Sequence, residues 1–318
     1  MICKEQSKKR LFEGFFNFTK TRKMSTARGT KTKVSSKRKN DLSKSLDLSQ
    51  IDEGKLKLMQ DKILNFYYSK GRQLPWRETT DKYHILVSEV MLQQTQVSRV
   101  LEKYKQWMLT YPTLQELSKA PLKDVLELWS GLGYNSRAKR LRDLAVEVVT
   151  KHKGVFPNTV QELLKLPGIG PYTANAVFIF SENRDIATVD ANIRRILISE
   201  MGIPEDSGDK ELFAYAQKCL PLGKSRDWHN ALMDYGALVA TGKKTGVTSK
   251  TKQSKFEGSR RFYRAELLRR VRANGGELDI GKCEEVVKGT KYTVDDVLSG
   301  LVQDGLLIYN GHVAVLSQ

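Results

Sequence analysis

Hydrophobic residues recur at helical spacing through residues 48–240. The stretch ILVSEVMLQQTQVSRVLEKYKQWMLTY (85–111) has an apolar side chain every three to four positions and predicts two successive helices. Alternating strand patterns are nearly absent from this region, so it predicts an all-α domain. The other segments with helical spacing are LKDVLELW (122–129), RAKRLRDLAVEVVTKH (137–152), VQELLKL (160–166), TANAVFIF (173–180), NIRRILISEM (192–201) and WHNALMDYGALVA (228–240).

The pattern changes in residues 261–318. A first helical stretch, RFYRAELLRRVRA, ends before two glycines, and a second, TVDDVLSGLVQ, opens with a variant capping box from Thr293 to Asp296. LIYNGHVAVL then predicts a β-hairpin that turns at Asn310-Gly311. A helical region that ends in a hairpin predicts a small winged-helix-like α+β domain. The fold class is therefore mainly α, with this smaller domain at the C-terminus.

Positive charge is concentrated at two places along the chain. The net charge is +18, and residues 1–47 hold 14 Lys/Arg against four Asp/Glu. Their composition predicts a disordered basic tail. Residues 241–260 hold six Lys/Arg against one Asp/Glu and have the composition of a basic linker. Residues 261–318 hold eight Lys/Arg and eight Asp/Glu. Basic segments of this kind favour a polyanionic partner, although a solvated tail without a partner has the same composition.

Several classes of protein are disfavoured by what the sequence lacks. No run approaches the roughly 20 apolar residues that cross a bilayer, and the first residues show no apolar signal segment. We therefore expect an intracellular protein that does not engage membranes. The three cysteines and four histidines have neither disulfide nor metal-ligand spacing, so free thiols and no metal are expected.

The stretch LPGIGPYTA (166–174) lies between two predicted helices. Gly168 and Gly170 let another backbone approach without a Cβ in the way. The N–H groups at the start of the second helix, which include that of Thr173, suit a phosphate. The stretch resembles the helix-hairpin-helix motif, which grips DNA phosphates without reading bases. A tight turn between packed core helices is the structural alternative.

Asp190 follows this hairpin, 18 residues after Tyr172, in ATVDANIRRI. By itself it would serve as a helix N-cap. A hairpin with an Asp at this distance resembles the signature of the helix-hairpin-helix DNA glycosylase superfamily. LPWRETTDKYHILVSEVMLQQTQV (74–97) and LWSGLGYNSRAKRL (128–141) narrow the resemblance to the MutY-type adenine glycosylases, over roughly residues 60–240.

The resemblance implies roles for individual residues. Glu89 falls on the catalytic acid that protonates the departing base, and Asp190 on the carboxylate that stabilises the sugar cation. Asn192 falls beside that carboxylate. Cleavage of an N-glycosidic bond calls for one protonated and one ionised carboxyl group. Members that also cut the DNA backbone carry a Lys where this chain has Tyr172, and a phenol forms no Schiff base. A monofunctional enzyme is therefore expected.

The same resemblance implies residues that hold DNA and the extruded base. Gln94 and Tyr134 match side chains that wedge into the duplex beside the flipped nucleotide, and Thr95 follows in the same DNA-binding segment. Trp76 and Arg77 match the wall of the base pocket. Trp76 and Tyr134 also suit ordinary core positions.

The chain departs from the adenine glycosylases in three ways. Their iron–sulfur cluster needs four Cys after GALV, whereas Ala240 holds the first ligand position and no Cys follows before residue 283. We expect no cluster and no other cofactor. Their 8-oxoguanine-sensing domain is replaced by the winged-helix-like region. A pocket Glu that contacts adenine is replaced by Asn230, whose amide pairs with adenine or with another base.

These features predict a mismatch DNA glycosylase of base excision repair that releases adenine opposite guanine or 8-oxoguanine. RDWHNALMDYGAL and TVDAN also resemble the thymine–guanine mismatch glycosylases, so a thymine or uracil glycosylase is the first alternative. The intact QQT segment favours adenine. A non-catalytic DNA-binding module is the second alternative. The expected partner is mismatched duplex DNA, bound by a monomer, in the cytoplasm or nucleoid, or in a nucleus.

Overall fold

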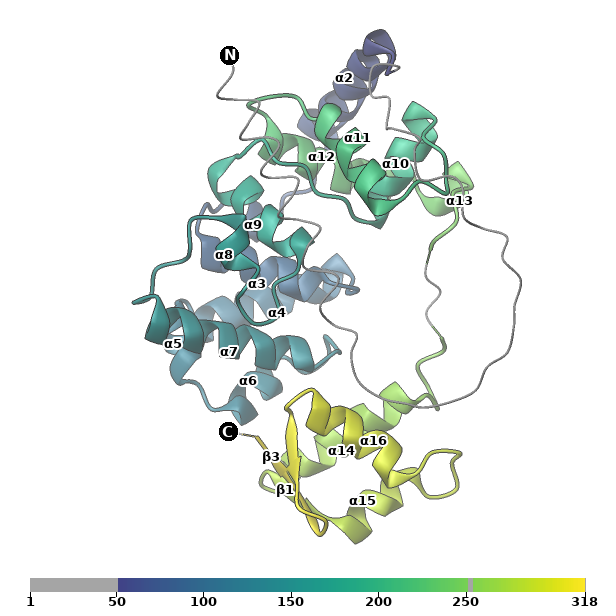
Figure 1. The fold of residues 1–318 in the computed structure, drawn as a ribbon. Coiled ribbons are helices and arrows are strands. Elements are labelled where there is room, and N and C mark those ends of the chain that lie inside the picture. The colour runs from purple at the N-terminus through teal and green to yellow at the C-terminus, as the bar shows by residue number, and fades with distance from the viewer. Residues whose placement is uncertain (1–50, 251–253, 318) are drawn as a thin grey trace, which may run out of the picture. The chain divides into compact units, whose positions relative to one another are not determined.

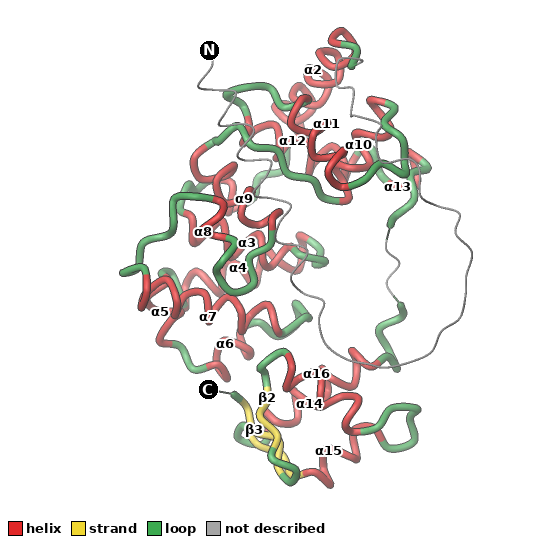
Figure 2. Tube along the Cα trace, in the orientation of Figure 1, coloured by secondary structure: helices red, strands yellow, loops and turns green. Residues whose placement is uncertain are grey.

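The structure is a computed structural model that describes residues 51–250 and 254–317 (Figure 1). The predicted basic tail, residues 1–47, lies outside the described part. Within the described residues, helices are the regular elements from residue 53 to residue 245, and strands occur only near the C-terminus (Figure 2). The elements up to residue 245 are α2 (Glu53–Lys70), the 3-10 turn η3 (Pro75–Arg77), α3 (Lys82–Leu92), α4 (Val97–Thr110), α5 (Leu114–Lys119), α6 (Leu122–Leu128), α7 (Ser136–Lys151), α8 (Val160–Leu163), α9 (Pro171–Glu182), α10 (Ala191–Met201), α11 (Asp209–Lys218), α12 (Ser225–Leu238) and α13 (Gly242–Thr245).

Polar side chains fix where several of these helices begin. Asp81 accepts hydrogen bonds from the backbone N–H groups of Tyr83 and His84 and caps α3. Thr113 forms a full capping box with Glu116 at the start of α5. Asp190 caps α10 through the N–H of Ile193. Each such cap satisfies N–H groups that have no acceptor inside the helix.

Helix α3 lies at the centre of the helical region and packs against α4, α7 and α9. All but three of its eleven residues are buried, which explains why KYHILVSEVML reads as almost continuously apolar. Trp107 and Trp129 meet edge to face in the core, with ring centroids 5.5 Å apart. A second group is formed by α10, which packs against α11 and α12 (Figure 1).

The predicted hairpin joins α8 to α9. Gly168 has a φ of +78°, and a Cβ there would lie 2.9 Å from Cβ of Arg140, so both conformation and space require glycine. Gly170 is the N-cap of α9, and nothing lies within 4 Å of where its Cβ would be. The chain therefore exposes bare backbone at the start of α9, where Pro171 occupies the first helical position.

The C-terminal region forms the predicted winged-helix-like α+β domain. Its elements are α14 (Arg260–Ala273), β1 (Glu277–Asp279), α15 (Ile280–Val287), α16 (Val294–Gln303), β2 (Leu307–Tyr309) and β3 (Val313–Leu316). The strands form an antiparallel sheet in the order β1-β3-β2, in which Ile308 pairs with Val315. The capping box of Thr293 and Asp296 is present, and the hairpin loop contains Gly311 with a φ of +94°.

Some elements were not anticipated. The hydrophobic pattern had not indicated α2, α5, α11, α15 or β1. Residues 241–260, predicted as a linker, contain the one-turn helix α13. Cys219 and Cys283 are buried free thiols, whereas Cys3 lies outside the described residues. No helix in the described ranges is long and apolar enough to cross a membrane.

Candidate active site

Glu89 lies in the middle of α3 and is 8% exposed. Burial raises the pKa of its carboxyl group most, the charge of Asp190 acts in the same direction, and the pKa comes to about 7 with all neighbouring groups in place. A hydrogen bond from Tyr172 and the positive charge of Arg77 act in the opposite direction. A carboxyl group in this environment is substantially protonated at neutral pH, as a general acid must be.

Tyr172 is the second residue of α9 and its hydroxyl is hydrogen-bonded to Glu89. Burial, together with the charges of Glu89 and Asp190, raises the pKa of the phenol well above its ordinary value. The phenol therefore stays protonated and acts as a donor. The contact joins α3 to α9 and brings together two residues that are 83 positions apart in the sequence.

Asp190 caps α10 and also lies near enough to Glu89 for its charge to act on that carboxyl group. Its Oδ1 accepts from the N–H of Ile193 (2.8 Å) and its Oδ2 from Nδ2 of Asn192 (3.1 Å). Burial raises the pKa of Asp190, whereas these donors lower it. Two carboxyl groups thus lie near each other, but only Asp190 is held by several N–H donors. This difference favours ionised Asp190 beside protonated Glu89.

Asn192 is held in turn by Arg195. Nη2 of Arg195 donates to Oδ1 of Asn192 (2.5 Å) and to the carbonyl oxygen of Gly236 (2.7 Å). Nε donates to the carbonyl oxygen of Ala240 (2.5 Å). A Cβ at Gly236 would lie 2.8 Å from Cβ of Asn192, so a larger residue there would displace the amide. The end of α12 and the start of α10 are therefore fixed relative to each other.

The predicted base-pocket residues come from two elements, η3 and α12. Asn230, on α12, is 6% exposed and hydrogen-bonds to the phenol of Tyr67. The guanidinium of Arg77 lies over the Tyr67 ring, 5.7 Å from its centroid. Trp76 is 7% exposed and packs edge to face against Tyr104 in the core. Asn230 and Arg77 thus share a neighbour, whereas Trp76 contributes to the core packing beneath them.

Comparison with known proteins agrees with this geometry. Residues 87–222 match the family described as HhH-GPD superfamily base excision DNA repair protein. A solved structure described as a thermostable thymine-DNA glycosylase is 31% identical, with a TM-score of 0.56 over 60% of this chain and 90% of that chain. The chain belongs to the HhH-GPD superfamily.

Curated members of the superfamily with similar sequences are adenine DNA glycosylases. The protein of Buchnera aphidicola subsp. Baizongia pistaciae is 39% identical over 180 residues, which cover 56% of this chain and 51% of that protein. The human protein is 33% identical over 245 residues, or 73% of this chain and 45% of its own length. This HhH-GPD chain thus spans about half the length of the curated relatives it matches.

Two loops of this HhH-GPD protein carry the predicted wedge residues. Gln94 is exposed and has a φ of +57°, and Tyr134 is 40% exposed with a φ of +48°. Such backbone conformations are uncommon for residues other than glycine and persist where the surroundings enforce them. Both residues stand at loop tips where a side chain can reach a ligand.

Arg137, at the start of α7, ties these two loops together. Its Nη1 donates to the carbonyl oxygens of Val90, Met91 and Gln93, at 2.7–3.1 Å. Its Nη2 donates to Oγ1 of Thr95 and to the carbonyl oxygens of Leu132 and Gly133, at 3.0–3.2 Å. Thr95, predicted to bind DNA, is therefore part of the support of the Gln94 loop. Sequence reasoning had missed Arg137.

Thr173 has a buried side chain whose Oγ1 accepts a hydrogen bond from Nε2 of Gln93 (3.3 Å). Its backbone N–H belongs to the first turn of α9, where N–H groups have no acceptor within the helix. The predicted phosphate contact of this residue is thus restricted to its backbone. Gly168 and Gly170 stand on either side of Ile169 just before that turn.

His229 is a buried residue that the sequence had not singled out. Its Nε2 accepts from the backbone N–H of Thr188 (3.2 Å), two residues before Asp190, and its Nδ1 donates to the carbonyl oxygen of Ser225 (2.7 Å). Burial lowers the pKa of the imidazole to about 4. A neutral histidine therefore holds the strand-like segment that delivers Asp190.

Asp234 is a second buried residue that the sequence had not singled out. Its buried carboxylate accepts from Nη1 and Nη2 of Arg77 (2.9 and 2.8 Å) and from the backbone N–H of Arg72 (2.7 Å). Side-chain hydrogen bonds from Arg77 lower the pKa of Asp234 against the effect of burial. The bidentate pair fixes the Arg77 guanidinium, whose charge acts on Glu89.

Proposed function

We propose that this protein is a monofunctional mismatch DNA glycosylase, which hydrolyses the N-glycosidic bond of adenine opposite guanine or 8-oxoguanine. The observation that carries the proposal is the pair of buried Glu89 and half-buried Asp190, in which the pKa of Glu89 is raised, chiefly by burial, to about 7. Binding DNA phosphates alone gives no reason to bring two carboxyl groups together, because carboxylates repel phosphates.

The two carboxyl groups divide the reaction between them. Protonated Glu89 donates its proton to a ring nitrogen of the extruded adenine, so that the base departs neutral. The electron pair of the N-glycosidic bond leaves with the base, and positive charge develops on the deoxyribose. Ionised Asp190 stabilises that charge. Asn192 holds Oδ2 of Asp190 and thereby orients the carboxylate toward the sugar.

Tyr172 supports the monofunctional assignment. It lies directly beside Glu89, and its buried phenol has no amine with which to form a Schiff base with the sugar. The product is then an intact abasic site: a water molecule supplies the oxygen at the sugar carbon, and the proton that it loses returns to the Glu89 carboxylate. Exposed Gln94 and Tyr134 fill the gap left by the flipped base. The partner is mismatched duplex DNA, bound by a monomer wherever the cell keeps its DNA.

A thymine or uracil glycosylase acting opposite guanine is the second candidate. It is favoured by the 31% identity with a thymine-DNA glycosylase that this chain covers over 90% of its length. It is also favoured by Asn230, because an amide offers both a donor and an acceptor to the edge of a base. Adenine is preferred because the curated relatives are adenine glycosylases and the QQT segment, residues 93–95, is intact.

The test uses end-labelled duplexes that contain A·8-oxoguanine, A·G, T·G or U·G, incubated with the protein and analysed with and without alkali. Strand cleavage after alkali on the adenine duplexes alone is the expected result. Cleavage without alkali would contradict the role given to Tyr172. Alkali-dependent cleavage of T·G or U·G instead would transfer the assignment to pyrimidines. If no duplex lost a base, the protein would be a DNA-binding module.

Asn230→Glu separates the first two candidates further. A carboxylate at this position accepts from the adenine amino group but repels the carbonyl oxygens of thymine and uracil. The adenine assignment predicts that the variant keeps or increases adenine release in single-turnover assays. The pyrimidine assignment predicts loss of T·G activity. Asn65→Glu, at an exposed position of α2, controls for the added charge.

A further inference from the structure

Residues 241–250 follow α12 where the resemblance to adenine glycosylases implies an iron–sulfur cluster. Such a cluster is held by four cysteine thiolates. Ala240 stands in the first ligand position, and the chain has no cysteine from residue 220 to residue 282. Among the described residues, no three His, Cys, Asp or Glu side chains gather in a way that could hold a metal ion. The residues present therefore do not fit a cluster.

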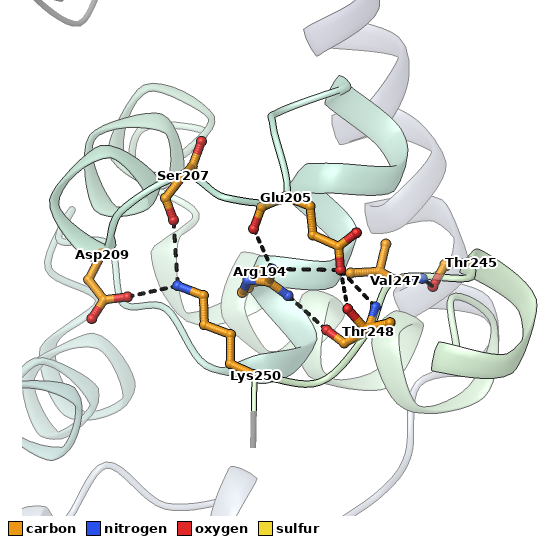
Figure 3. A network of polar contacts seen from close by, with 8 residues as sticks. All are labelled: Arg194, Glu205, Ser207, Asp209, Thr245, Val247, Thr248 and Lys250. Atoms are coloured by element: carbon orange, nitrogen blue, oxygen red, sulfur yellow. Dashed lines mark hydrogen bonds and ion pairs between the residues drawn. The ribbon is translucent and has the colours of Figure 1, made fainter. Parts of the chain in front are cut away.

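A set of direct polar contacts holds this segment instead (Figure 3). Arg194, a buried residue of α10, donates through Nη1 to the carbonyl oxygen of Thr248 (3.1 Å) and through Nη2 to that of Glu205 (2.6 Å). Oε1 of Glu205 accepts from the backbone N–H of Thr248 (2.9 Å) and from its hydroxyl (2.5 Å). The segment is thus bonded to the helical region through its backbone as well as its side chains.

Lys250 adds a contact at the far end of the segment. Its Nζ lies 3.3 Å from Oδ1 of Asp209, at the start of α11, and 3.5 Å from the carbonyl oxygen of Ser207 (Figure 3). At the near end, Thr241 caps α13 through the N–H of Lys244, and Gly246 ends that helix with a φ of +71°. The segment therefore has a defined conformation between two anchored ends.

After these contacts are counted, residues 241–250 still carry excess positive charge. Arg194 and Lys250 are matched by Glu205 and Asp209. Residues 241–250 contain no acidic residue, and their other two lysines, Lys243 and Lys244, are both exposed on α13. The contact set is close to neutral, so these two lysines present positive charge that it does not use. A duplex phosphate backbone is the partner that such a pair fits.

The placement of α13 brings this charge near the proposed chemistry. Helix α13 packs against α10, the helix that Asp190 caps. Arg194 is four residues beyond Asp190, or about 6 Å along the helix axis. The neighbouring Arg195 holds both Asn192 and the carbonyl oxygen of Ala240, directly before the segment. The chain on both sides of α13, at Ala240 and Thr248, is therefore held by the first turns of α10, the end that Asp190 caps.

We infer that residues 241–250 form a metal-free DNA clamp, in which Arg194, Glu205 and Thr248 hold the segment and Lys243 and Lys244 bind duplex phosphates. The inference rests on the proposed function, because it takes duplex DNA as the ligand. Lysines bind phosphates as point charges. Their contribution to affinity is independent of base sequence and falls with salt. Arg194 and Glu205 are positioning residues, since they act through the conformation of the segment.

The clamp is tested by measuring the affinity of the full chain for a fluorescein-labelled duplex that contains an abasic-site analogue, over a range of salt concentrations. Lys243→Ala/Lys244→Ala should weaken binding about tenfold at low salt and reduce the slope of log Kd against log salt by about 2. Lys119→Ala/Lys123→Ala, two exposed lysines on α5 and α6, is the matched control and should change neither value.

The positioning residues are tested by hydrogen exchange. Glu205→Ala should speed exchange in residues 241–250 and weaken DNA binding, with little change in the thermal midpoint of unfolding. Thr248→Val, which keeps side-chain volume and loses the hydroxyl, should show a smaller effect of the same sign. The clamp inference would be overturned if Lys243→Ala/Lys244→Ala bound DNA with wild-type affinity. It would also be overturned if hydrogen exchange in residues 241–250 were unchanged in both Glu205→Ala and Thr248→Val. A wild type that binds DNA through these lysines but releases no base would sink the glycosylase proposal and support the clamp.

Discussion

The Tyr172 hydroxyl donates a hydrogen bond to the carboxylate of Glu89, and this bond opposes the effect of burial on the acid. Burial favours the protonated form of Glu89 and raises its pKa. The phenol stabilises the ionised carboxylate and so brings the pKa down to about 7. A proton donor is most effective when its pKa lies near the working pH. The pair therefore adjusts the acid to physiological conditions.

Tyr172→Phe should raise the pKa of Glu89 above about 7, because the variant loses the donor to the ionised form. We expect the alkaline limb of the single-turnover pH–rate profile to move to higher pH, while base release is retained. Tyr83→Phe is the matched control, since Tyr83 is a buried tyrosine of α3, the helix of Glu89, and its hydroxyl donates to the carbonyl oxygen of Tyr111. An unshifted limb in Tyr172→Phe would show that Glu89 is not the titrating acid.

Glu89 also predicts how stability depends on pH. Its folded-state pKa, about 7, is higher than the ordinary value of 4.5. The native state therefore binds the proton more tightly, and stability falls as pH rises from about 4.5 to 7. The shift corresponds to about 3 kcal/mol. In urea unfolding at several pH values, Glu89→Gln should abolish this decrease and exceed the wild type in stability at pH 8. Base release should fall about 10²–10⁴-fold while DNA binding persists.

His229 predicts that stability depends on pH in the opposite direction. Its folded-state pKa of about 4 is lower than the ordinary 6.5, so the unfolded chain binds the proton more tightly. Stability is present above about pH 6.5 and is lost as pH falls toward 4, by about 3 kcal/mol. His229→Gln removes the titrating group and should show a smaller loss between pH 7 and 4. Urea unfolding of both proteins measures the difference, and parallel curves would contradict the role of burial.

The carboxyl pair could be predicted from the sequence because its residues stand in distinctive local patterns. SEVMLQQT carries Glu89, and the hairpin with a downstream Asp carries Asp190. The periodicity that predicts helices is equally local, and it correctly separated α3 from α4. Asp190 illustrates a limit, because an N-cap and a catalytic carboxylate give the same sequence signal and only the fold shows that it lies near Glu89.

The supporting residues could not be predicted because their partners are distant or are backbone atoms. Arg137 bonds to five carbonyl oxygens, which every residue type supplies and no pattern marks. Asp234 meets Arg77 across 157 positions. Residues 241–250 have the composition of a linker, yet Arg194 holds the backbone of Thr248. Burial of such groups is decided by tertiary packing, which a single sequence does not display.

Arg137 supplies the last prediction. Arg137 is 8% exposed, and its guanidinium donates to six acceptors in and beside the Gln94 and Tyr134 loops. The planar guanidinium group directs its N–H donors in a fixed geometry that an ammonium group does not reproduce. Arg137→Lys retains the charge but leaves several buried carbonyl groups without their donor, which costs about 1–3 kcal/mol. We expect both wedge residues to lose their left-handed backbone conformations, because the loops that enforce them loosen.

Arg137→Lys should impair extrusion of the target base while the overall fold is retained. A duplex with 2-aminopurine at the target position reports extrusion by fluorescence, and Arg137→Lys should reduce the amplitude about tenfold, equivalent to about 1.4 kcal/mol in the flipping equilibrium. Arg142→Lys is the control, because it makes the same exchange on α7, and its Nε donates to the carbonyl oxygen of Ala120 and not to the Gln94 and Tyr134 loops. Equal amplitudes in the two variants would show that the loops hold Gln94 and Tyr134 without Arg137.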